Sequence, residues 1–192
     1  MTVANFRLFC LIFVILLLLE RSWELFIRRP SQEKGFIEHK WSLPVLIVTY
    51  IIILLFSVVE LLTVSRKIRL DISGIGLLIF IFAFILRNWS VSALGKFHST
   101  NIEIKPDHRL IKNGPYRYIR HPYYVSVMLE VMSIPLIINA FSSFCAVFII
   151  YVPSVLMRVF LEERVLIKRF PVEYLSYKSD VMAFLPLRKK DK

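Results

Sequence analysis

The chain has 192 residues, of which 57% are hydrophobic and 14% aromatic, and its mean hydropathy is +0.64. Soluble domains carry about half apolar residues and do not gather them into long runs, so this composition excludes an ordinary soluble domain. The net charge of +11 would suit a nucleic-acid-binding protein, but the cations are divided unevenly between alternate loops. That division is typical of membrane topology and lipid contact, and it argues against nucleic acid as a partner.

Five long apolar runs predict helices that cross a membrane, because about 20 helical residues span the hydrocarbon core. The first run continues into polar residues without a small-residue cleavage site, so we interpret it as a span rather than a signal peptide. The runs are Phe6–Leu19, Leu43–Val64, Ile72–Leu86, Tyr123–Ile138 and Phe141–Leu161. The sequence thus predicts a single-domain, all-α integral membrane protein over residues 1–192, with three spans in 1–95 and two in 96–192.

The first three helices are expected at about Asn5–Arg28, Leu43–Ser65 and Asp71–Gly95. The stretch DISG offers Asp71 as an N-cap for the third helix, and Gly95 is a natural stop at its end. Lys96–Arg120 is then the longest polar connection, and long ordered loops of this kind are often functional.

The C-terminal part of the chain predicts a helical hairpin and a surface helix. The last two spans are joined only by Asn139–Ser143, so they should form a tight antiparallel hairpin. In the polar tail that follows, Phe170, Tyr174, Tyr177 and Val181 are spaced along one face of a helix. Such a tail suits an amphipathic helix that lies at the membrane surface.

The loop cations predict the orientation of the chain in the membrane. With five spans, segments 28–41, 96–120 and 164–192 share one side and carry 18 Lys and Arg residues. The other side carries only four, which are Arg7, Arg66, Lys67 and Arg69. Because cytoplasmic loops hold the excess of positive charge, we expect the N-terminus outside and the C-terminus in the cytoplasm.

Several charged residues fall within or at the ends of the spans. A lone charge at the centre of a span costs about 2.5–3.5 kcal/mol on insertion scales, so such residues are usually paired or face a polar cavity. Arg21 and Glu24 stand at i, i+3 and suit a pair that snorkels at the end of the first helix. Arg158 and Glu162 stand at i, i+4 on the last helix.

Polar groups at the start of the fourth helix and the end of the fifth outline one cytoplasm-facing pocket. Arg120 and His121 lie at a helix N-terminus, which favours anions, and Glu162 and Glu163 add carboxylates. The aromatic residues nearby are Tyr116, Tyr118, Tyr123, Tyr124, Tyr174 and Tyr177. These groups suit a zwitterionic, nucleotide-like ligand.

Two other classes of ligand lack support in the sequence. ATP would need a glycine-rich phosphate loop, whereas Gly74 and Gly76 lack a third glycine and are interpreted as helix packing. Cys10 and Cys145 lie inside apolar runs, so neither a disulfide framework nor a metal centre is expected.

Three stretches carry a resemblance to a known family. They are LRNWSVSALGKF (Leu86–Phe97), HRLIKNGPYRYIRHPYYVS (His108–Ser126) and RVFLEERVLIKRFPVEYLSYKSDVMAFLP (Arg158–Pro186). In this order they resemble the isoprenylcysteine carboxyl methyltransferase family, which is related to phospholipid methyltransferases. The stretch RSWEL in the first helix is similar to family members with an Arg-x-x-Glu-Leu signature.

The resemblance implies S-adenosylmethionine as the cofactor, bound at the cytoplasmic end of residues 96–192. The residues it places at the cofactor are Leu110, Gly114, Tyr116, Arg120, His121, Pro122, Tyr124, Glu162, Glu163, Tyr174 and Tyr177. Two positions depart from the family pattern, since Ser126 and Pro171 stand where glycine is common. Ser126 is still small, whereas Pro171 suggests a stiffer entry to the tail helix.

The acceptor would be lipophilic and would enter from the bilayer, and its reacting group stays open. Methyl transfer gains most from proximity and orientation. A carboxylate acceptor needs only a cation to position it, for which Arg158 is the first candidate and Arg87 the second. An amine or an enolic hydroxyl must lose a proton, and Glu130 or Glu163 would then be the base.

The resemblance therefore leaves several functions to compare. The acceptor could be a prenylcysteine carboxylate, a polyketide-derived or other lipid hydroxyl, or a phospholipid amine. A small transporter and a non-catalytic scaffold are the alternatives from other classes. The sequence does not fix the oligomeric state.

Overall fold

The computed structural model describes residues 2–26, 35–64, 67–105 and 107–186. The predicted end of the first helix at Arg28 lies outside these residues, as does the end of the second at Ser65. The same holds for part of the cation pattern, namely Arg28, Arg29, Lys34, Arg66, Arg188, Lys189, Lys190 and Lys192.

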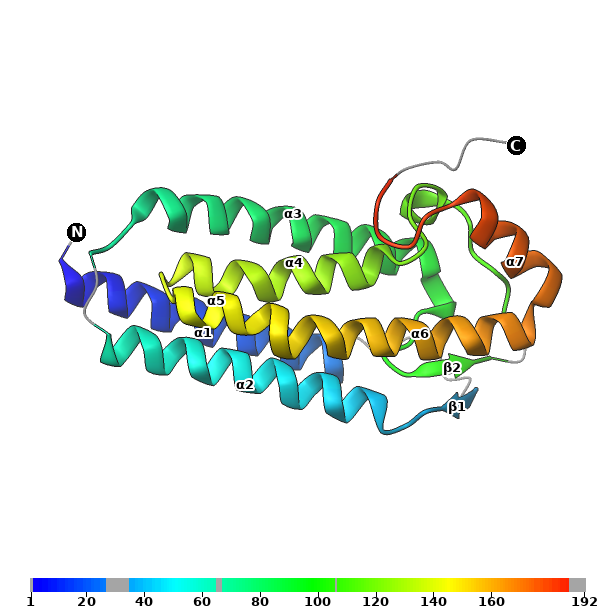
Figure 1. Ribbon diagram of the computed structural model, residues 1–192, viewed down its shortest axis with the longest axis horizontal. Helices are drawn as coiled ribbons and strands as arrows, with labels where there is room; N and C mark the ends of the chain where they lie inside the picture. The colour runs from blue at the N-terminus through cyan, green and yellow to red at the C-terminus, as the bar shows by residue number, and fades with distance from the viewer. Residues whose placement is uncertain (1, 27–34, 65–66, 106, 187–192) are drawn as a thin grey trace.

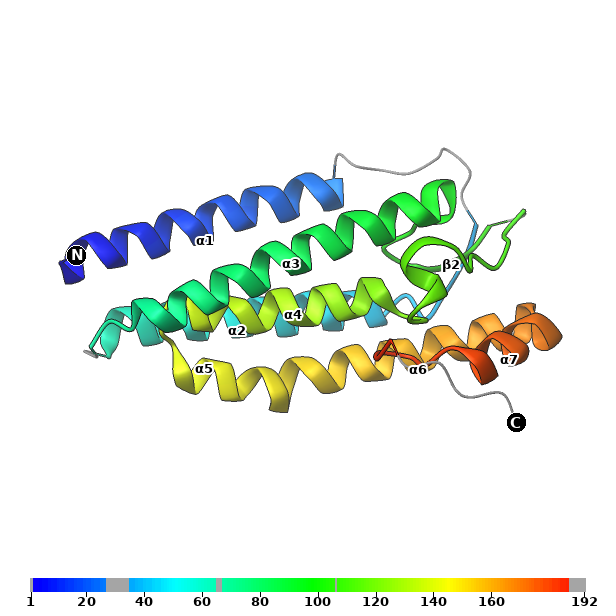
Figure 2. The ribbon, with the colours of Figure 1, turned by 90° about the horizontal axis from the view of Figure 1, so that it is seen from above.

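Apolar helices make up most of the molecule, as the composition predicts. The first part contains α1 (Val3–Phe26), α2 (Ser42–Thr63) and α3 (Leu70–Leu94). The second part contains α4 (Pro122–Ile137), α5 (Phe141–Ala146), the π-helical segment η3 (Val147–Tyr151), α6 (Val152–Arg169) and α7 (Pro171–Asp180). The helices of the bundle run side by side, and the N-terminus and the α7 end lie at opposite ends (Figures 1 and 2).

The apolar runs predict five spans, whereas four helices in the described residues are long enough to cross a membrane. Val3–Glu24, Ser42–Thr63, Leu70–Phe97 and Phe141–Arg169 are long and apolar enough to cross a membrane. Residues Pro122–Ile137 form a shorter apolar helix of 16 residues, about 24 Å at 1.5 Å per residue, against a hydrocarbon core of about 30 Å. The multi-pass helical fold is confirmed, and the fifth span remains a prediction.

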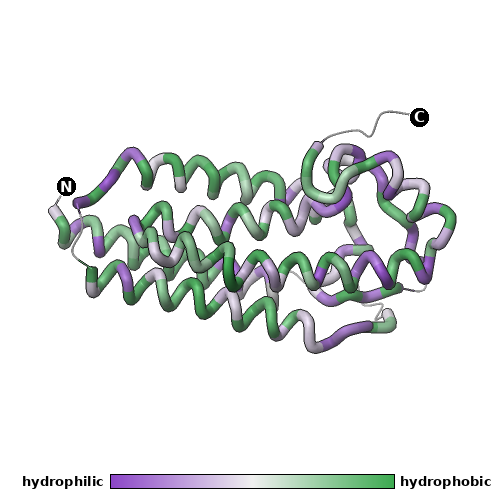
Figure 3. The backbone as a smooth tube through the Cα atoms, in the orientation of Figure 1, coloured by the Kyte–Doolittle hydropathy of each residue, from purple (hydrophilic) through white to green (hydrophobic). Residues whose placement is uncertain are grey.

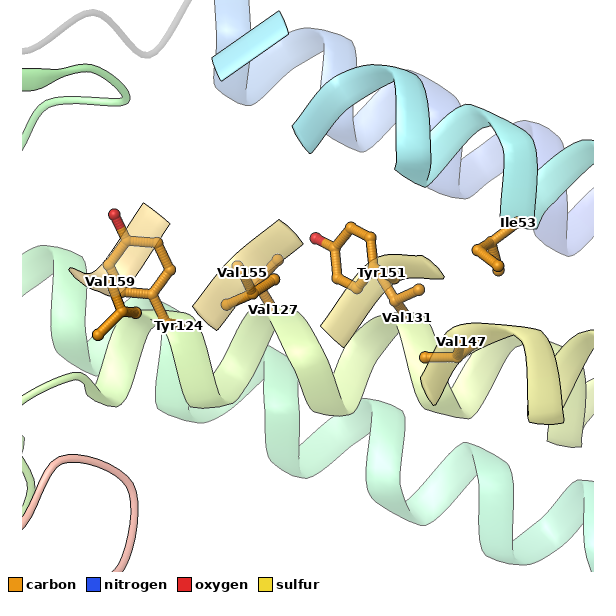
Figure 4. Packing of buried hydrophobic residues seen from close by; sticks show 8 residues of the cluster. All are labelled: Ile53, Tyr124, Val127, Val131, Val147, Tyr151, Val155 and Val159. Carbon is orange, nitrogen blue, oxygen red and sulfur yellow. The ribbon is translucent and has the colours of Figure 1, made fainter. Parts of the chain in front are cut away.

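The core lies where α4 meets α2 and the α5–α6 stretch. Figure 4 shows Val127 and Val131 of α4 facing Val147, Val155 and their neighbours, and all of these side chains are buried. Inside a membrane such side chains stabilise the fold through van der Waals packing between the helices, not through removal of apolar surface from water. Colouring by hydropathy shows hydrophobic residues along the bundle and more hydrophilic ones toward the end that carries α7 (Figure 3).

One glycine sets the distance between α3 and α4. A Cβ atom at Gly76 would lie 2.8 Å from the backbone nitrogen of Ile137 and 3.0 Å from the Cβ of Leu136. At Gly74 a Cβ atom would meet nothing within 4 Å. The packing interpretation is therefore confirmed for Gly76, whereas Gly74 faces open space.

The turn between α4 and α5 is hydrogen-bonded to α2 and to the residue before α3. Glu60 of α2 accepts hydrogen bonds from the backbone N–H groups of Ser142 (3.0 Å) and Ser143 (2.8 Å), which caps α5. Asn139 adopts a positive φ of 59° and accepts a bond of 2.6 Å from the N–H of Arg69 before α3. After this turn the chain runs back along α4 (Figures 1 and 2).

Three local expectations differ from the structure. The N-cap assigned to Asp71 is wrong, because α3 begins at Leu70 and Asp71 pairs with Arg69 in the first turn (2.7 Å). The all-α class omits a short antiparallel sheet, in which β1 (Phe36–Glu38) pairs with β2 (Ile102–Ile104). The fifth apolar run is divided by the π-helical segment. The stop at Gly95 is confirmed, since Gly95 is the C-cap of α3 with a φ of 52°.

Candidate functional site

Two cavities meet at the end of the bundle that carries α7. The first, here called the bundle cavity, is lined by α1, α2, α4 and α6 together with residues 98–100. The second, here called the loop cavity, lies among the connection 97–120, α6 and α7. Six residues line both cavities, namely Leu94, Ser99, Tyr116, Arg120, His121 and Glu162. A ligand in either cavity would therefore contact the same wall.

The wall of the loop cavity is shaped by a short turn in the connection. Gly114 opens the 3-10 helix η2 (Gly114–Arg117) with a φ of 58°, a conformation that favours glycine. A Cβ atom there would lie 3.0 Å from the Cβ of Ala93, so the turn packs closely on α3. This turn buries Tyr116, whose carbonyl accepts a hydrogen bond from the hydroxyl of Tyr177 on α7.

Glu163 of α6 binds side chains both at the start of α4 and in α7. Its carboxylate lies 3.0 Å from Nε2 of His121, 2.6 Å from a guanidinium nitrogen of Arg120 and 2.6 Å from Nζ of Lys178. The backbone N–H groups of Arg120 and His121 also donate to the carbonyls of Met182 (2.9 Å) and Ala183 (3.0 Å). Glu163 thus connects α6, the residues before α4, and α7.

Glu162, one position earlier, lines both the bundle cavity and the loop cavity. Its carboxylate accepts a hydrogen bond from the hydroxyl of Tyr124, which in turn accepts one from Nε of Arg158 at 3.1 Å. The other guanidinium nitrogens of Arg158 donate to Oγ of Ser42 (3.0 Å) and to the carbonyl of Thr100. Arg158 is only 3% exposed, and every one of its side-chain nitrogens has a partner within the protein.

Some buried polar atoms of the loop cavity have no partner among the residues that the structure describes. They are the hydroxyl of Tyr174, Nε of Arg120 and Nδ1 of His108. Burial raises the pKa of Tyr174, so its hydroxyl stays neutral. Burial, and then the charge of Lys105, lowers the pKa of His108. Because unmet hydrogen-bonding capacity is costly in a buried site, these atoms point to a polar ligand.

A cluster of charges lies inside the bundle beside the bundle cavity. Arg21 binds Glu130 at 2.6–2.8 Å and Glu24 at 2.7 Å. Arg87 binds Glu130 at 2.8 Å and also pairs with Glu20. The pairing of Arg21 with Glu24 is confirmed, but their side chains are only 14% and 7% exposed. The pair is therefore internal to the bundle, and the interpretation as snorkelling end groups is wrong.

The structure brings most of the predicted cofactor residues to the loop cavity. Those that line it are Leu110, Tyr116, Arg120, His121, Glu162, Tyr174 and Tyr177, whereas Tyr124 and Arg158 line the bundle cavity. Gly114, Pro122, Glu163, Arg87 and Glu130 are absent from the lining of both cavities. Gly114 and Glu163 support the wall, and Arg87 and Glu130 belong to the ion cluster.

Sequence reasoning missed several lining residues. The α2 wall with Tyr50, and Tyr151 of the π-helical segment, lie within apolar runs that carry no signal of a site. His98 and Thr100 lie in the long connection, whose length alone suggested function. His108 opens one of the stretches that carry the resemblance, which could have identified it. Within the described ranges, no three His, Cys, Asp or Glu side chains gather as metal ligands would.

The comparisons with known proteins agree with the fold. The model of the isoprenylcysteine carboxyl methyltransferase (ICMT) family matches residues 75–168. The uncharacterized protein YpbQ of Bacillus subtilis (strain 168) is 29% identical over 158 residues, which cover 80% of this chain and 94% of YpbQ.

A solved structure has a similar fold. It is the eukaryotic intramembrane Ras methyltransferase ICMT, with a TM-score of 0.56 and 21% sequence identity. The match covers 81% of this chain, which spans 56% of the length of that structure.

Proposed function

Because the chain belongs to the isoprenylcysteine carboxyl methyltransferase family, a family of membrane methyltransferases, we propose that it transfers a methyl group from S-adenosylmethionine to a lipophilic acceptor. The observation that carries this proposal is the pair of adjoining cavities. One is bounded by loops and holds buried polar atoms without a partner among the described residues, the other lies among the helices, and they share a wall at Arg120, His121 and Glu162.

The loop cavity fits the cofactor in the chemistry of its lining. S-adenosylmethionine supplies a methyl group activated by a sulfonium centre. Nε of Arg120 is available to donate to the cofactor carboxylate, and the hydroxyl of Tyr174 can bond to its polar groups. The carboxylate of Glu162 suits ribose hydroxyls, and Phe97 and His108, with ring centroids 5.2 Å apart, offer aromatic contact for adenine.

The predicted cofactor residues divide into two groups in this proposal. Seven contact the cofactor directly: Leu110, Tyr116, Arg120, His121, Glu162, Tyr174 and Tyr177. Gly114, Pro122 and Glu163 act through the wall that they shape. Tyr124 lies between the cavities, since it lines the bundle cavity and donates to Glu162.

The bundle cavity is assigned to the acceptor. Leu43, Leu46 and Ile47 of α2 and Val127 of α4 give it apolar walls, which suit a lipid chain. The shared wall would hold the reacting atoms of both ligands close together, and alignment of this kind is the largest contribution expected from the protein.

The first test is calorimetric titration of the detergent-purified full chain with S-adenosylhomocysteine. We expect micromolar binding by the wild type, with a loss of about 10-fold or more in Glu162→Gln and about 2- to 10-fold in Tyr174→Phe. Tyr118→Phe is the matched control, because Tyr118 lies in the same connection but is 55% exposed and outside the lining of both cavities.

Absence of binding by the wild type would overturn the assignment and favour a transporter or a scaffold. Transfer of tritium from labelled S-adenosylmethionine into a lipid extract then separates an enzyme from a protein that only binds the cofactor. Cofactor binding without transfer into any lipid fraction would contradict the enzymatic part of the proposal.

A further inference from the structure

A third cavity, here called the end cavity, lies at the end of the bundle away from α7. It is lined by the start of α1, the end of α2, the residues before α3 and the turn after α4. Figure 1 shows the ends of these helices gathered near the N-terminus. Among the described residues, none that lines the end cavity also lines the bundle cavity or the loop cavity. The end cavity is therefore separate from the proposed methyl-transfer site.

The end cavity lies at the depth of lipid headgroups. The membrane-spanning stretch of α1 begins at Val3, that of α2 ends at Thr63, and that of α3 begins at Leu70. All three limits fall on or beside residues of the lining. The headgroup region adds about 5–7 Å to each side of the hydrocarbon core, so the cavity is reached from this region rather than from the centre of the membrane.

Two cations of the lining have no partner among the residues that the structure describes. Arg7 is half-buried, and it lies one turn inside the span that begins at Val3. Lys67 is exposed and lies between α2 and α3. Charges within a span are usually paired or face a polar cavity, so two cations that share one cavity indicate a site for an anion.

The other polar side chains of the lining are engaged within the protein. Oε1 of Glu60 accepts a hydrogen bond of 3.0 Å from the N–H of Ser142. Oε2 of Glu60 accepts bonds of 2.8 Å from both the N–H and the hydroxyl of Ser143. Asn139 accepts a bond of 2.6 Å from the backbone before α3. The lining residues thus carry two cations against one carboxylate, which leaves one excess positive charge.

The rest of the lining is apolar and includes part of the rim. Val3 and Val64 are 55% and 40% exposed, whereas Phe6, Leu61 and Ile138 are buried in one core cluster. An apolar rim beside two cations suits an anion that is joined to hydrocarbon chains. Free phosphate gains nothing from such a rim, because it has no apolar surface to place against it.

We propose that the end cavity binds the phosphate of an anionic phospholipid, taken from the leaflet at this end of the bundle, and that Arg7 and Lys67 are its donors. Basic pockets between transmembrane helices bind lipid headgroups in this way. One phosphodiester carries one negative charge, which balances the excess charge of the lining. A zwitterionic headgroup adds a cation that Arg7 and Lys67 repel, so it should bind less tightly.

A lipid bound in the end cavity would connect α1 to the rest of the bundle. Arg7 and Phe6 belong to α1, Leu61 and Val64 to the end of α2, and Lys67 to the connection that follows. Because the lipid would contact all of these segments only in the folded arrangement, its binding should raise the melting temperature.

The test uses the full chain in nanodiscs of phosphatidylcholine that contain brominated phosphatidylglycerol or brominated phosphatidylcholine. Bromine on a lipid quenches a nearby fluorophore. In a background with Cys145→Ser, bimane is attached to Leu62→Cys, because Leu62 is 48% exposed and outside the lining. We expect the anionic lipid to bind about 5-fold or more tightly than the zwitterionic lipid at this position. At Leu78→Cys on α3, a residue that is 69% exposed, the ratio should be about 1.

Substitution of the two cations should remove this preference. Arg7→Gln combined with Lys67→Gln should lower the ratio at residue 62 to about 1, whereas Arg7→Lys keeps the charge and should keep most of the preference. Arg69→Gln is the matched control, since Arg69 is exposed at the same end, pairs with Asp71 at 2.7 Å and lies outside the lining. This variant should leave the ratio unchanged.

Two outcomes of the quenching experiment would overturn the proposal. They are equal binding of both lipids to the wild type at residue 62, and a preference that survives in the double variant. If the double variant does not fold, the wild-type ratios at residues 62 and 78 still decide whether an anionic lipid gathers at the end cavity.

Thermal unfolding in a neutral detergent distinguishes a lipid from free phosphate. Phosphatidylglycerol should raise the melting temperature of the wild type and of Arg69→Gln by several degrees more than phosphatidylcholine does. The double variant should lose about half of this rise or more. Inorganic phosphate at the same concentration should have no such effect. A rise with phosphate as large as that with phosphatidylglycerol would assign the end cavity to free phosphate and overturn the lipid as its ligand.

Discussion

At the scale of single residues, neighbouring groups of one chemical type have different tasks because their partners differ. Glu162 lines both cavities, whereas Glu163 is held by His121, Arg120 and Lys178 and supports the wall. Sequence adjacency made the two carboxylates equivalent candidates, since both lie in one motif. Only the direction of each side chain from α6 distinguishes a ligand contact from a structural junction.

The buried histidine of the loop cavity gives a prediction about pH. The pKa of His108 is lowered below its usual 6.5 by burial and by the charge of Lys105. Below pH 6.5, His108 is therefore protonated more readily in the unfolded chain than in the folded chain. The free energy of unfolding is not reduced by His108 above pH 6.5, and it falls as the pH drops below that value. Thermal unfolding in detergent should show this decline between pH 7 and 5.

The matched variant for this experiment is His108→Gln. It removes the titrating group and keeps a polar side chain between Phe97 and Phe170. Its melting temperature should fall less than that of the wild type over the same pH range. An equal decline in both proteins would show that other groups govern the acid sensitivity.

At the scale of elements, α3 packs closely against α4 at Gly76. Gly76→Leu would insert a side chain where the backbone of Ile137 already lies at 2.8 Å from the expected Cβ. Overpacking of this kind typically costs about 1–3 kcal/mol, which for a chain of this size lowers the melting temperature by several degrees.

The control for this substitution lies two residues away on the same helix. Gly74→Leu enters open space and gains helix propensity of up to about 1 kcal/mol, so its melting temperature should be unchanged or raised. Thermal unfolding of both variants by circular dichroism in detergent checks the pair. Equal destabilisation would show that helix contact at Gly76 is less close than the structure indicates.

The elements also show how far the sequence determines the outcome. Apolar runs locate α1, α2, α3 and the α5–α6 stretch, because each helix repeats its hydrophobic signal over many residues. The π-helical segment within α5–α6 escapes prediction, since an apolar run such as Val147–Tyr151 has the same composition in either helix type. The three-residue strands β1 and β2 are too short for a periodic signal and depend on pairing between distant segments.

In the candidate site, too, features that are local in the sequence could be predicted and contacts between distant segments could not. The loop-cavity residues lie in consecutive motifs, so the resemblance could name most of them from the sequence. The place of Glu24 in the lining of the bundle cavity depends on how α1 packs beside α3 and α4, and spacing along α1 predicts only its pair with Arg21. Tertiary placement therefore adds the residues that line the second cavity.

At the scale of the whole molecule, both cavities and the tail helix lie at the end of the bundle opposite the N-terminus (Figure 1). Of the loop cations within the described residues, those of segments 96–120 and 164–178 lie toward this same end. We therefore predict that this end faces the cytoplasm and that the start of α1 faces outward.

Labelling of engineered cysteines in intact cells checks this orientation. In a background without Cys145, Lys67→Cys should react with a membrane-impermeant maleimide from outside, because Lys67 is exposed at the opposite end of the bundle. Ser179→Cys on α7 should react only after the cells are permeabilised. Cys10 is buried and should stay unlabelled in both. The reverse labelling pattern would invert the topology.

The attachment of the tail has a consequence for how the protein is made. The carbonyls of Met182 and Ala183 hold the backbone at Arg120 and His121, and the hydroxyl of Tyr177 holds Tyr116, so segments near the end of the chain close a wall laid down some sixty residues earlier. During synthesis every helix of the bundle leaves the ribosome before these contacts can form. A chain truncated before residue 177 and released from the ribosome would contain the helices through α6 yet lack the segments that close the loop cavity. Closure of the loop cavity is thus a late event in biogenesis, completed only when the tail docks.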